Sequence, residues 1–232
     1  MTTASLVHFV QQWLEARRDA ERAVQMAAYM KTEMPFYGVA APGLDALIKL
    51  IKVQFPIHSS DDLEQSMRAL WALPHREEKH LALRLGKTHK KYIAWSHLSL
   101  FEDLIREGAW WDFVDTIASH LIGHLVKTMP EEAFDVMDEW IMDEDMWIRR
   151  TAIICQLGLK QQTDAERLFS YCALRMDEKE FFIRKAIGWA LREYTRTAPD
   201  DVFDFLIEHR EYLSGLSFRE GAKRLRKLGY DL

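Results

Sequence analysis

The chain has 232 residues, of which 48% are hydrophobic and 29% are charged, and its formal net charge is −5. This composition is that of a folded protein, so it excludes wholesale disorder, and no apolar run approaches the ~18 residues of a membrane span. Glycine (10) and proline (6) are scarce, which argues against β-sandwiches, Rossmann folds and glycine-rich nucleotide loops. The two cysteines, Cys155 and Cys172, form no CxxC pair and no export signal is visible, so we expect a reduced, cytoplasmic protein.

Apolar residues recur at helical spacing from the start of the chain. Two such sets are Leu6, Val7, Val10, Trp13 and Leu14 in the first segment, and Leu44, Leu47, Ile48 and Ile51 in a later one. Signals for helix starts are frequent and include Pro42, Ser60 and Pro130. The sequence therefore predicts about a dozen helices with short connections, in a single all-α domain over residues 1–232.

A period of 35 residues runs through the second half of the chain. The repeating strings are Phe113-Val114-Asp115, Ile148-Arg149-Arg150, Ile183-Arg184-Lys185 and Phe218-Arg219-Glu220. A period of this length with two helices per unit is typical of HEAT-like helical solenoids, in which equivalent positions line up on one surface. We therefore expect Asp115, Arg150 and Lys185 to form a polar column on the inner, concave face of the solenoid.

The predicted column combines charged and aromatic side chains. Trp111 lies one helical turn before Asp115, and Trp189 lies one turn after Lys185. Arginine and lysine hold phosphate oxygens, indole faces attract cations, and a carboxylate can stabilise a developing oxocarbenium ion. Two alternatives stay open, because Asp115 could equally form a helix-packing salt bridge to Arg150 and a tryptophan at helical spacing is often a core residue.

Charge and metal ligands add two further expectations. The basic stretches at 76–91, with Lys90 and Lys91, and at 219–227, with Arg219, could form a positive face that contributes to binding a polyanion, and solvated helix faces are the alternative. His120 and His124 share a helical face but lack a nearby third ligand, so we expect no metal site there.

Seven segments give the chain a specific resemblance over nearly its whole length. They are MAAYMK (26–31), PFYGV (35–39), LWALPHRE (70–77), WWDFVD (110–115), WIRRTAI (147–153), FFIRKAIGWALREY (181–194) and SFREGAKRL (217–225). In content and order they resemble the DNA alkylation repair family of HEAT-repeat DNA glycosylases (AlkD-like). One departure lies at Ala40–Asp45, where family members commonly carry a polar residue before the proline and basic residues after it.

The resemblance implies a monofunctional glycosylase that releases cationic alkylated purines, chiefly N3-alkyladenine and N7-alkylguanine, from double-stranded DNA. It implies that Asp115 is catalytic and that Trp111 and Trp189 contact the lesion's sugar and backbone. It further implies that Arg150 holds phosphate and that Tyr29 belongs to the same cleft. Lys185 and Arg192 are the remaining expected DNA contacts. We expect a monomer that needs no cofactor.

Two other classes of function remain open. The first is a non-catalytic HEAT-repeat protein that binds distorted or branched DNA, and it differs from the glycosylase in releasing no base. The second is a protein-interaction solenoid without a DNA role. Both the glycosylase and the non-catalytic DNA-binding protein should bind DNA with steep salt dependence, and the protein-interaction solenoid should not.

Overall fold

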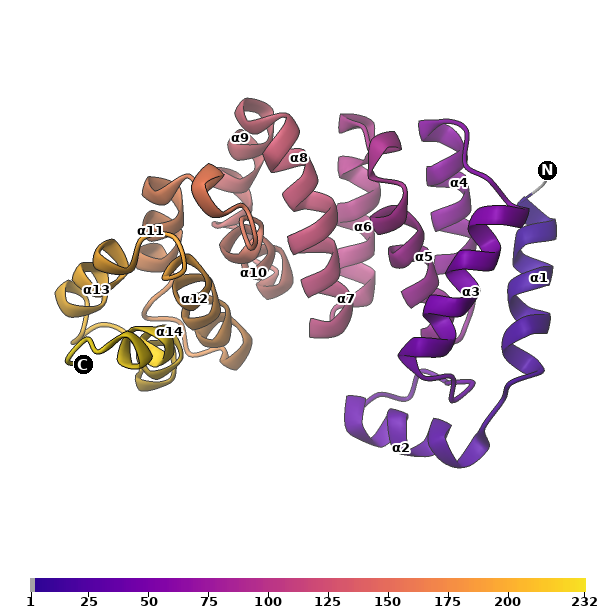
Figure 1. Ribbon diagram of the computed structural model, residues 1–232, viewed down its shortest axis with the longest axis horizontal. Helices are drawn as coiled ribbons and strands as arrows, with labels where there is room; N and C mark the ends of the chain where they lie inside the picture. The colour runs from indigo at the N-terminus through magenta and orange to yellow at the C-terminus, as the bar shows by residue number, and fades with distance from the viewer. Residues whose placement is uncertain (1–2) are drawn as a thin grey trace. The chain divides into compact units, whose positions relative to one another are not determined.

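The computed structural model describes residues 3–232, and every regular element within them is a helix (Figure 1). The prediction of an all-α fold is therefore confirmed. None of the helices in this described part of the chain is long and apolar enough to cross a membrane. The chain forms two compact units that divide between Leu100 and Phe101, and the single-domain organisation stays a prediction.

Five α-helices lie wholly within the described part of the first unit, residues 3–100. They are α1 (Thr3–Glu15), α2 (Ala20–Met30), α3 (Ala41–Gln54), α4 (Ser60–Trp71) and α5 (Arg76–Thr88), followed by the 3₁₀ turns η1 (Lys90–Tyr92) and η2 (Trp95–His97). Helix α1 packs on α3 and α4, and α5 packs on the same two helices. The expected apolar face of α3 is buried in full, while Val7 and Trp13 of α1 are only partly buried.

A buried carboxylate joins α5 to the loop between α2 and α3. The side chain of Glu77 is fully buried and accepts the backbone N–H groups of Tyr37 (3.1 Å), Gly38 (2.8 Å) and Val39 (3.0 Å). Gly38 has φ +88°, and a Cβ there would lie 2.1 Å from the carbonyl oxygen of Asp19. Two of the segments that carry the sequence resemblance, 35–39 and 70–77, are thus held together as one structural feature.

The second unit begins within α6 (Leu98–Gly108). Its other elements are α7 (Trp111–Thr116), the π-helix η3 (Ile117–Ile122), α8 (Gly123–Thr128), α9 (Pro130–Trp140), α10 (Met146–Ile154), η4 (Lys160–Gln162), α11 (Ala165–Leu174), α12 (Phe181–Tyr194), α13 (Pro199–Glu208) and α14 (Gly215–Leu228). Helices α7, η3 and α8 are continuous in sequence. Helix α7 packs on α10, α10 on α12, and α12 on α14 (Figure 1).

The 35-residue period corresponds to this succession of helices. Phe113, Ile148, Ile183 and Phe218 occupy equivalent places near the starts of α7, α10, α12 and α14, and all four are buried. Each period thus adds one inner helix with its apolar residue in the core. The predicted repeat is confirmed in the second unit. It places the third residue of each string on a common side of the stack, and these residues are Asp115, Arg150, Lys185 and Glu220.

Candidate active site on the repeated helices

The first two members of the predicted column form a bidentate ion pair. Arg150 Nε donates to Asp115 Oδ1 at 2.8 Å, and Arg150 Nη2 donates to Asp115 Oδ2 at 3.0 Å. Arg150 Nη1 donates to the carbonyl oxygen of Phe182 on α12. The guanidinium therefore ties α7, α10 and α12 together and fixes the orientation of the Asp115 carboxylate.

The two partners differ in their access to solvent. The side chain of Arg150 is 4% exposed, whereas that of Asp115 is 18% exposed. Burial raises the pKa of Asp115 above its ordinary value, the Arg150 guanidinium opposes this shift, and the nearby Asp112 adds to it. Asp115 is thus the more accessible member of the pair, and Arg150 chiefly orients the Asp115 carboxylate.

Lys185, the third residue of the predicted column, belongs to a second ion pair. Glu220 of α14 is buried, and its carboxylate accepts hydrogen bonds from Lys185 (3.2 Å) and Arg192 on α12 and from Lys223 (2.5 Å) on α14. Asp115, Arg150, Lys185 and Glu220 are spaced by 35 residues each, so the equivalent positions on successive helices are acidic, basic, basic and acidic, and each acid pairs with the adjacent base. The sequence reasoning placed Glu220 in this register but gave it no role.

Gly188 allows the close approach that puts Glu220 beside its cations. A Cβ on Gly188 would lie 2.4 Å from Glu220 Cβ and 2.9 Å from the carbonyl oxygen of Ser217. Any larger residue would push α14 away from α12. The glycine in the AIGWAL part of the α12 segment is therefore a packing requirement next to Trp189.

The Glu220 cluster predicts a stability change at acid pH. Burial alone would raise the pKa of Glu220, but Lys223, Lys185 and Arg192 outweigh it and lower the pKa from an ordinary 4.5 to about 2. Because the folded-state pKa is the lower one, the stabilisation is complete above about pH 4.5 and is lost as the pH falls towards 2. We expect Glu220→Gln to lower Tm by about 5 °C at pH 7, and this difference should shrink between pH 4.5 and pH 2. A Tm difference that stays constant down to pH 2 would contradict this account.

The two tryptophans expected at the site are half-buried. Trp111 is the first residue of α7, one turn before Asp115, and Trp189 lies one turn after Lys185 on α12. Neither belongs to the buried core, so part of each indole is available for contact.

Three other aromatic residues pack against one another next to the ion pair of Asp115 and Arg150. The rings of Trp147 and Phe182, which are 35 residues apart, lie 4.9 Å apart, and Trp110 packs against both at 6.1 and 5.6 Å. Trp147 is 7% exposed. Since Phe182 also supplies the carbonyl that holds Arg150, this aromatic cluster fixes the ion pair. The sequence analysis did not assign this role, although the spacing of Trp147 and Phe182 signalled it.

The remaining predicted DNA contacts lie in different surroundings. Tyr29, at the end of α2, is 75% exposed. Lys91 is exposed with its Nζ 4.5 Å from the Tyr92 ring, Lys90 is half-buried, and Arg219 is exposed on α14. Arg150, Lys185, Arg192 and Arg219 lie on α10, α12 and α14 of the second unit, and Tyr29, Lys90 and Lys91 belong to the first unit.

The basic stretch at 76–91 is only partly a surface feature. Arg76 is buried, Lys79 donates to the carbonyls of Trp71 and Leu73, and Arg84 pairs with Asp45 at 3.1 Å. Pairing with Arg84 also gives Asp45, the acidic residue of the Ala40–Asp45 departure, a structural partner. At least half of the lysines and arginines in the stretch 76–91 thus make contacts within the fold.

The His, Cys, Asp and Glu side chains of the described residues include potential metal ligands and two thiols. No group of three or more His, Cys, Asp or Glu side chains in residues 3–232 is arranged to hold a metal ion. Cys155 and Cys172 are buried, and burial raises the pKa of each thiol to about 12. Both cysteines are therefore poor nucleophiles at neutral pH.

Together, the repeated inner helices and the ion pair of Asp115 with Arg150 between them define a helical-repeat protein with charged side chains on its inner helices. The model of the family described as DNA alkylation repair enzyme matches residues 10–225. The chain belongs to this family, so the resemblance seen in the sequence is confirmed.

Solved structures agree with this assignment. One described as a predicted DNA alkylation repair enzyme from Enterococcus faecalis is 32% identical, with a TM-score of 0.83, and the match covers 90% of this chain and 97% of that one. AlkD2 from Streptococcus mutans shares the fold at 16% identity and a TM-score of 0.61, covering 87% of this chain and 98% of that one. The smu.31 protein of Streptococcus mutans UA159 also shares the fold, at 16% identity and a TM-score of 0.60, and the match covers 78% of this chain and 92% of that one. No curated protein matches the chain.

Proposed function

We propose that this protein is a monofunctional DNA glycosylase that hydrolyses the N-glycosidic bond of cationic alkylated purines, N3-alkyladenine and N7-alkylguanine, in duplex DNA. This reaction would initiate base excision repair. The observation that carries the proposal is the Asp115 carboxylate, which is partly exposed, fixed by Arg150 and preceded one turn earlier by the half-buried Trp111. Membership of a DNA alkylation repair family supports the choice of substrate.

The chemistry suits a site with one oriented carboxylate. An alkylated purine already carries a positive charge, so the bond from C1′ to the base nitrogen can break with its electron pair leaving on the base. The deoxyribose then becomes oxocarbenium-like, and the anionic Asp115 stabilises it at short range in a partly desolvated site. Asp115 also positions a water, whose oxygen bonds to C1′ while the proton that this water loses passes to solvent. No cofactor is needed for these steps.

DNA binding is assigned to the remaining residues of the predicted set. Trp111 and Trp189 would contact the sugar and backbone of the lesion, with indole faces that favour the cationic base. Phosphates would be held by basic or aromatic side chains, namely Lys185, Arg192 and Arg219 in the second unit and Tyr29, Lys90 and Lys91 in the first. Arg150 would reach a phosphate only through the Nη N–H groups that Asp115 and Phe182 leave available. We propose a monomer that acts on DNA in the cytoplasm.

The proposal is tested by incubating the protein with methylated duplex DNA and analysing both products. We expect free N7-methylguanine, together with abasic sites in strands that remain unbroken until heated in alkali. Undamaged duplex should release nothing. Binding without release would instead favour the alternative function, a non-catalytic protein for distorted or branched DNA, in which the pair of Asp115 and Arg150 only packs helices.

Trp189→Ala tests the assignment of the indole on α12. Because Trp189 is half-buried, we expect the variant to lose about 0.5–2 kcal/mol of binding to methylated duplex, the range of a cation–π contact, with little change in Tm. Trp147→Ala is the matched control, because its indole is 7% exposed and its loss should cost about 3–5 kcal/mol of stability. A collapse of Tm in Trp189→Ala, like that of the control, would make Trp189 a core residue.

A further inference from the structure

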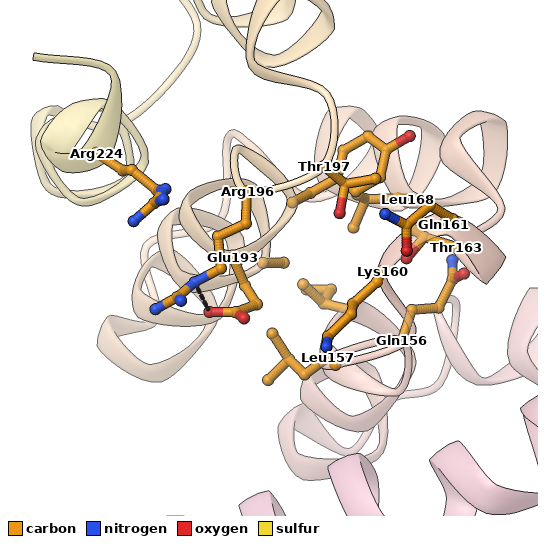
Figure 2. Close-up of a pocket in the computed structure, with 14 residues that line it drawn as sticks. Gln156, Leu157, Lys160, Gln161, Thr163, Leu168, Glu193, Arg196, Thr197 and Arg224 are labelled. Carbon is orange, nitrogen blue, oxygen red and sulfur yellow. Dashed lines mark hydrogen bonds and ion pairs between the residues drawn. The ribbon is translucent and has the colours of Figure 1, made fainter. Parts of the chain in front are cut away.

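A pocket of about 290 Å³ lies at the C-terminal end of α12, away from the Asp115 carboxylate. It is bounded by the α10–α11 connection, the end of α12 and α14 (Figure 2). Its lining includes polar side chains from all three segments, such as Gln156, Lys160, Thr163, Tyr194, Thr197 and Arg224. Neither Asp115 nor Arg150 lines it, so the proposed glycosylase site does not account for this pocket.

A second hollow of about 310 Å³ adjoins the first and is strongly basic. Five cations and one carboxylate line it, namely Arg192, Arg196, Lys223, Arg224, Lys227 and Glu193. Glu193, Arg196 and Arg224 also line the first pocket. The two hollows therefore meet at these three side chains. The first hollow is lined mainly by polar groups and the second mainly by cations.

Not all of these positive charges are neutralised within the protein. Arg192 and Lys223 pair with Glu220, and Arg196 pairs with Glu193 at 3.1 Å (Figure 2). Within residues 3–232, Arg224 and Lys227 form no ion pair. The excess charge is thus concentrated on α14, at the place where the two hollows meet.

Arg224 also carries a polar atom that the fold leaves unsatisfied. Its Nε is buried and finds no hydrogen-bond acceptor in the described part of the chain. Buried N–H groups in native proteins are normally paired, so an unpaired guanidinium N–H at a pocket marks a place for a ligand oxygen. The guanidinium fork matches phosphate oxygens, and Lys227 can add a point charge to the same anion.

We propose that this junction is a second ligand site, which binds a phosphate ester through Arg224 and Lys227 and places the attached nucleoside in the 290 Å³ pocket. Two sources share this chemistry. One is a phosphate of the DNA strand, since Arg192 lies one turn of α12, about 5 Å, beyond Trp189. The other is a free mononucleotide. The site does not depend on base release at Asp115.

The test uses the full chain, two probes without any lesion, and three variants. The probes are 2′-deoxyadenosine 5′-monophosphate, followed by calorimetry, and an undamaged DNA duplex, followed by fluorescence anisotropy over a salt series. Arg224→Gln and Lys227→Gln remove one charge each from the junction. Lys127→Gln removes one exposed charge on α8 and is the matched control.

Each source gives its own supporting result. If the site takes a free nucleotide, both junction variants should bind the monophosphate at least tenfold more weakly than the control does. If it takes a strand phosphate, each variant should make the slope of log K against log salt shallower by about 0.9, the value for one lost phosphate contact. Lys227 is exposed, so Lys227→Gln decides the matter if Arg224→Gln fails to fold. Junction variants that match the control with both probes would overturn the proposal, whether or not the protein releases bases.

Discussion

Replacing Asp115 with Asn is expected to slow the release of N7-methylguanine from methylated duplex by about 100-fold or more. That is the usual size of the effect when one preorganised electrostatic group is lost from a reacting centre. Asparagine keeps the shape of the side chain and one acceptor for Arg150, but it has no negative charge for the developing oxocarbenium ion. DNA affinity should change little, because a carboxylate does not attract phosphate. Single-turnover kinetics measure the rate of base release, and a binding titration with the same duplex measures the DNA affinity.

The ion pair with Arg150 makes a stability control necessary. In Asp115→Asn the amide nitrogen replaces Oδ2, which accepts from Arg150 Nη2 at 3.0 Å, so two donors face each other and stability should fall by about 1–3 kcal/mol. Glu178→Gln is a matched control, because Glu178 accepts two hydrogen bonds from Arg149 at 2.8 and 2.9 Å and is about as buried as Asp115. It should lose stability by a similar amount and release base at the wild-type rate per folded molecule.

Equal rates per folded molecule in both variants would remove Asp115 from the mechanism. The pair with Arg150 would then be a helix-packing contact, as the sequence alone allowed. If the wild type also released nothing while binding duplex DNA, the non-catalytic function would replace the glycosylase. The experiment thus distinguishes an incorrect assignment of the catalytic residue from an incorrect assignment of the activity.

The 35-residue period explains why much of the second unit could be predicted from the sequence. Buried apolar residues such as Phe113 and Ile148 recur at this spacing because each repeat adds an equivalent inner helix. Polar residues two positions later must then be neighbours, which predicted the contact of Asp115 with Arg150. The same rule placed Glu220 next to Lys185 and marked a second ion pair, but the sequence reasoning treated Lys185 only as a phosphate ligand.

Charge in the first unit was harder to predict, because burial of a charged residue depends on contacts distant in sequence. The segment around Arg76 was interpreted from its composition as part of a basic surface, yet Arg76, Glu77 and Glu78 are all buried. What buries Glu77 is the loop at residues 35–39, about 40 residues earlier in the chain. Neither helical periodicity nor net charge carries that information, and no 35-residue repeat extends over this loop to supply it.

Glu77→Ala is expected to be strongly destabilising, at about 3–5 kcal/mol. The variant would leave the buried N–H groups of Tyr37, Gly38 and Val39 without an acceptor, and each such group costs about 1–3 kcal/mol when no water reaches it. A loss of this size is a large share of a typical domain's 5–15 kcal/mol. Urea unfolding of the full chain measures it, with the exposed Glu33→Ala as the control near the same loop.

Glu77→Gln separates the hydrogen bonds from the charge. Its Oε1 can still accept from Gly38 and Val39, but its amide nitrogen would face the N–H of Tyr37, so a smaller loss of about 1–3 kcal/mol is expected. The loop also positions α2, because Asp19 N–H donates to the Tyr37 carbonyl at 2.9 Å. If Tyr29 of α2 contacts DNA, both Glu77 variants should therefore bind duplex more weakly even where they are folded. An Ala variant as stable as the Glu33 control would show that water or another acceptor satisfies the loop, and Glu77 would then have no structural role.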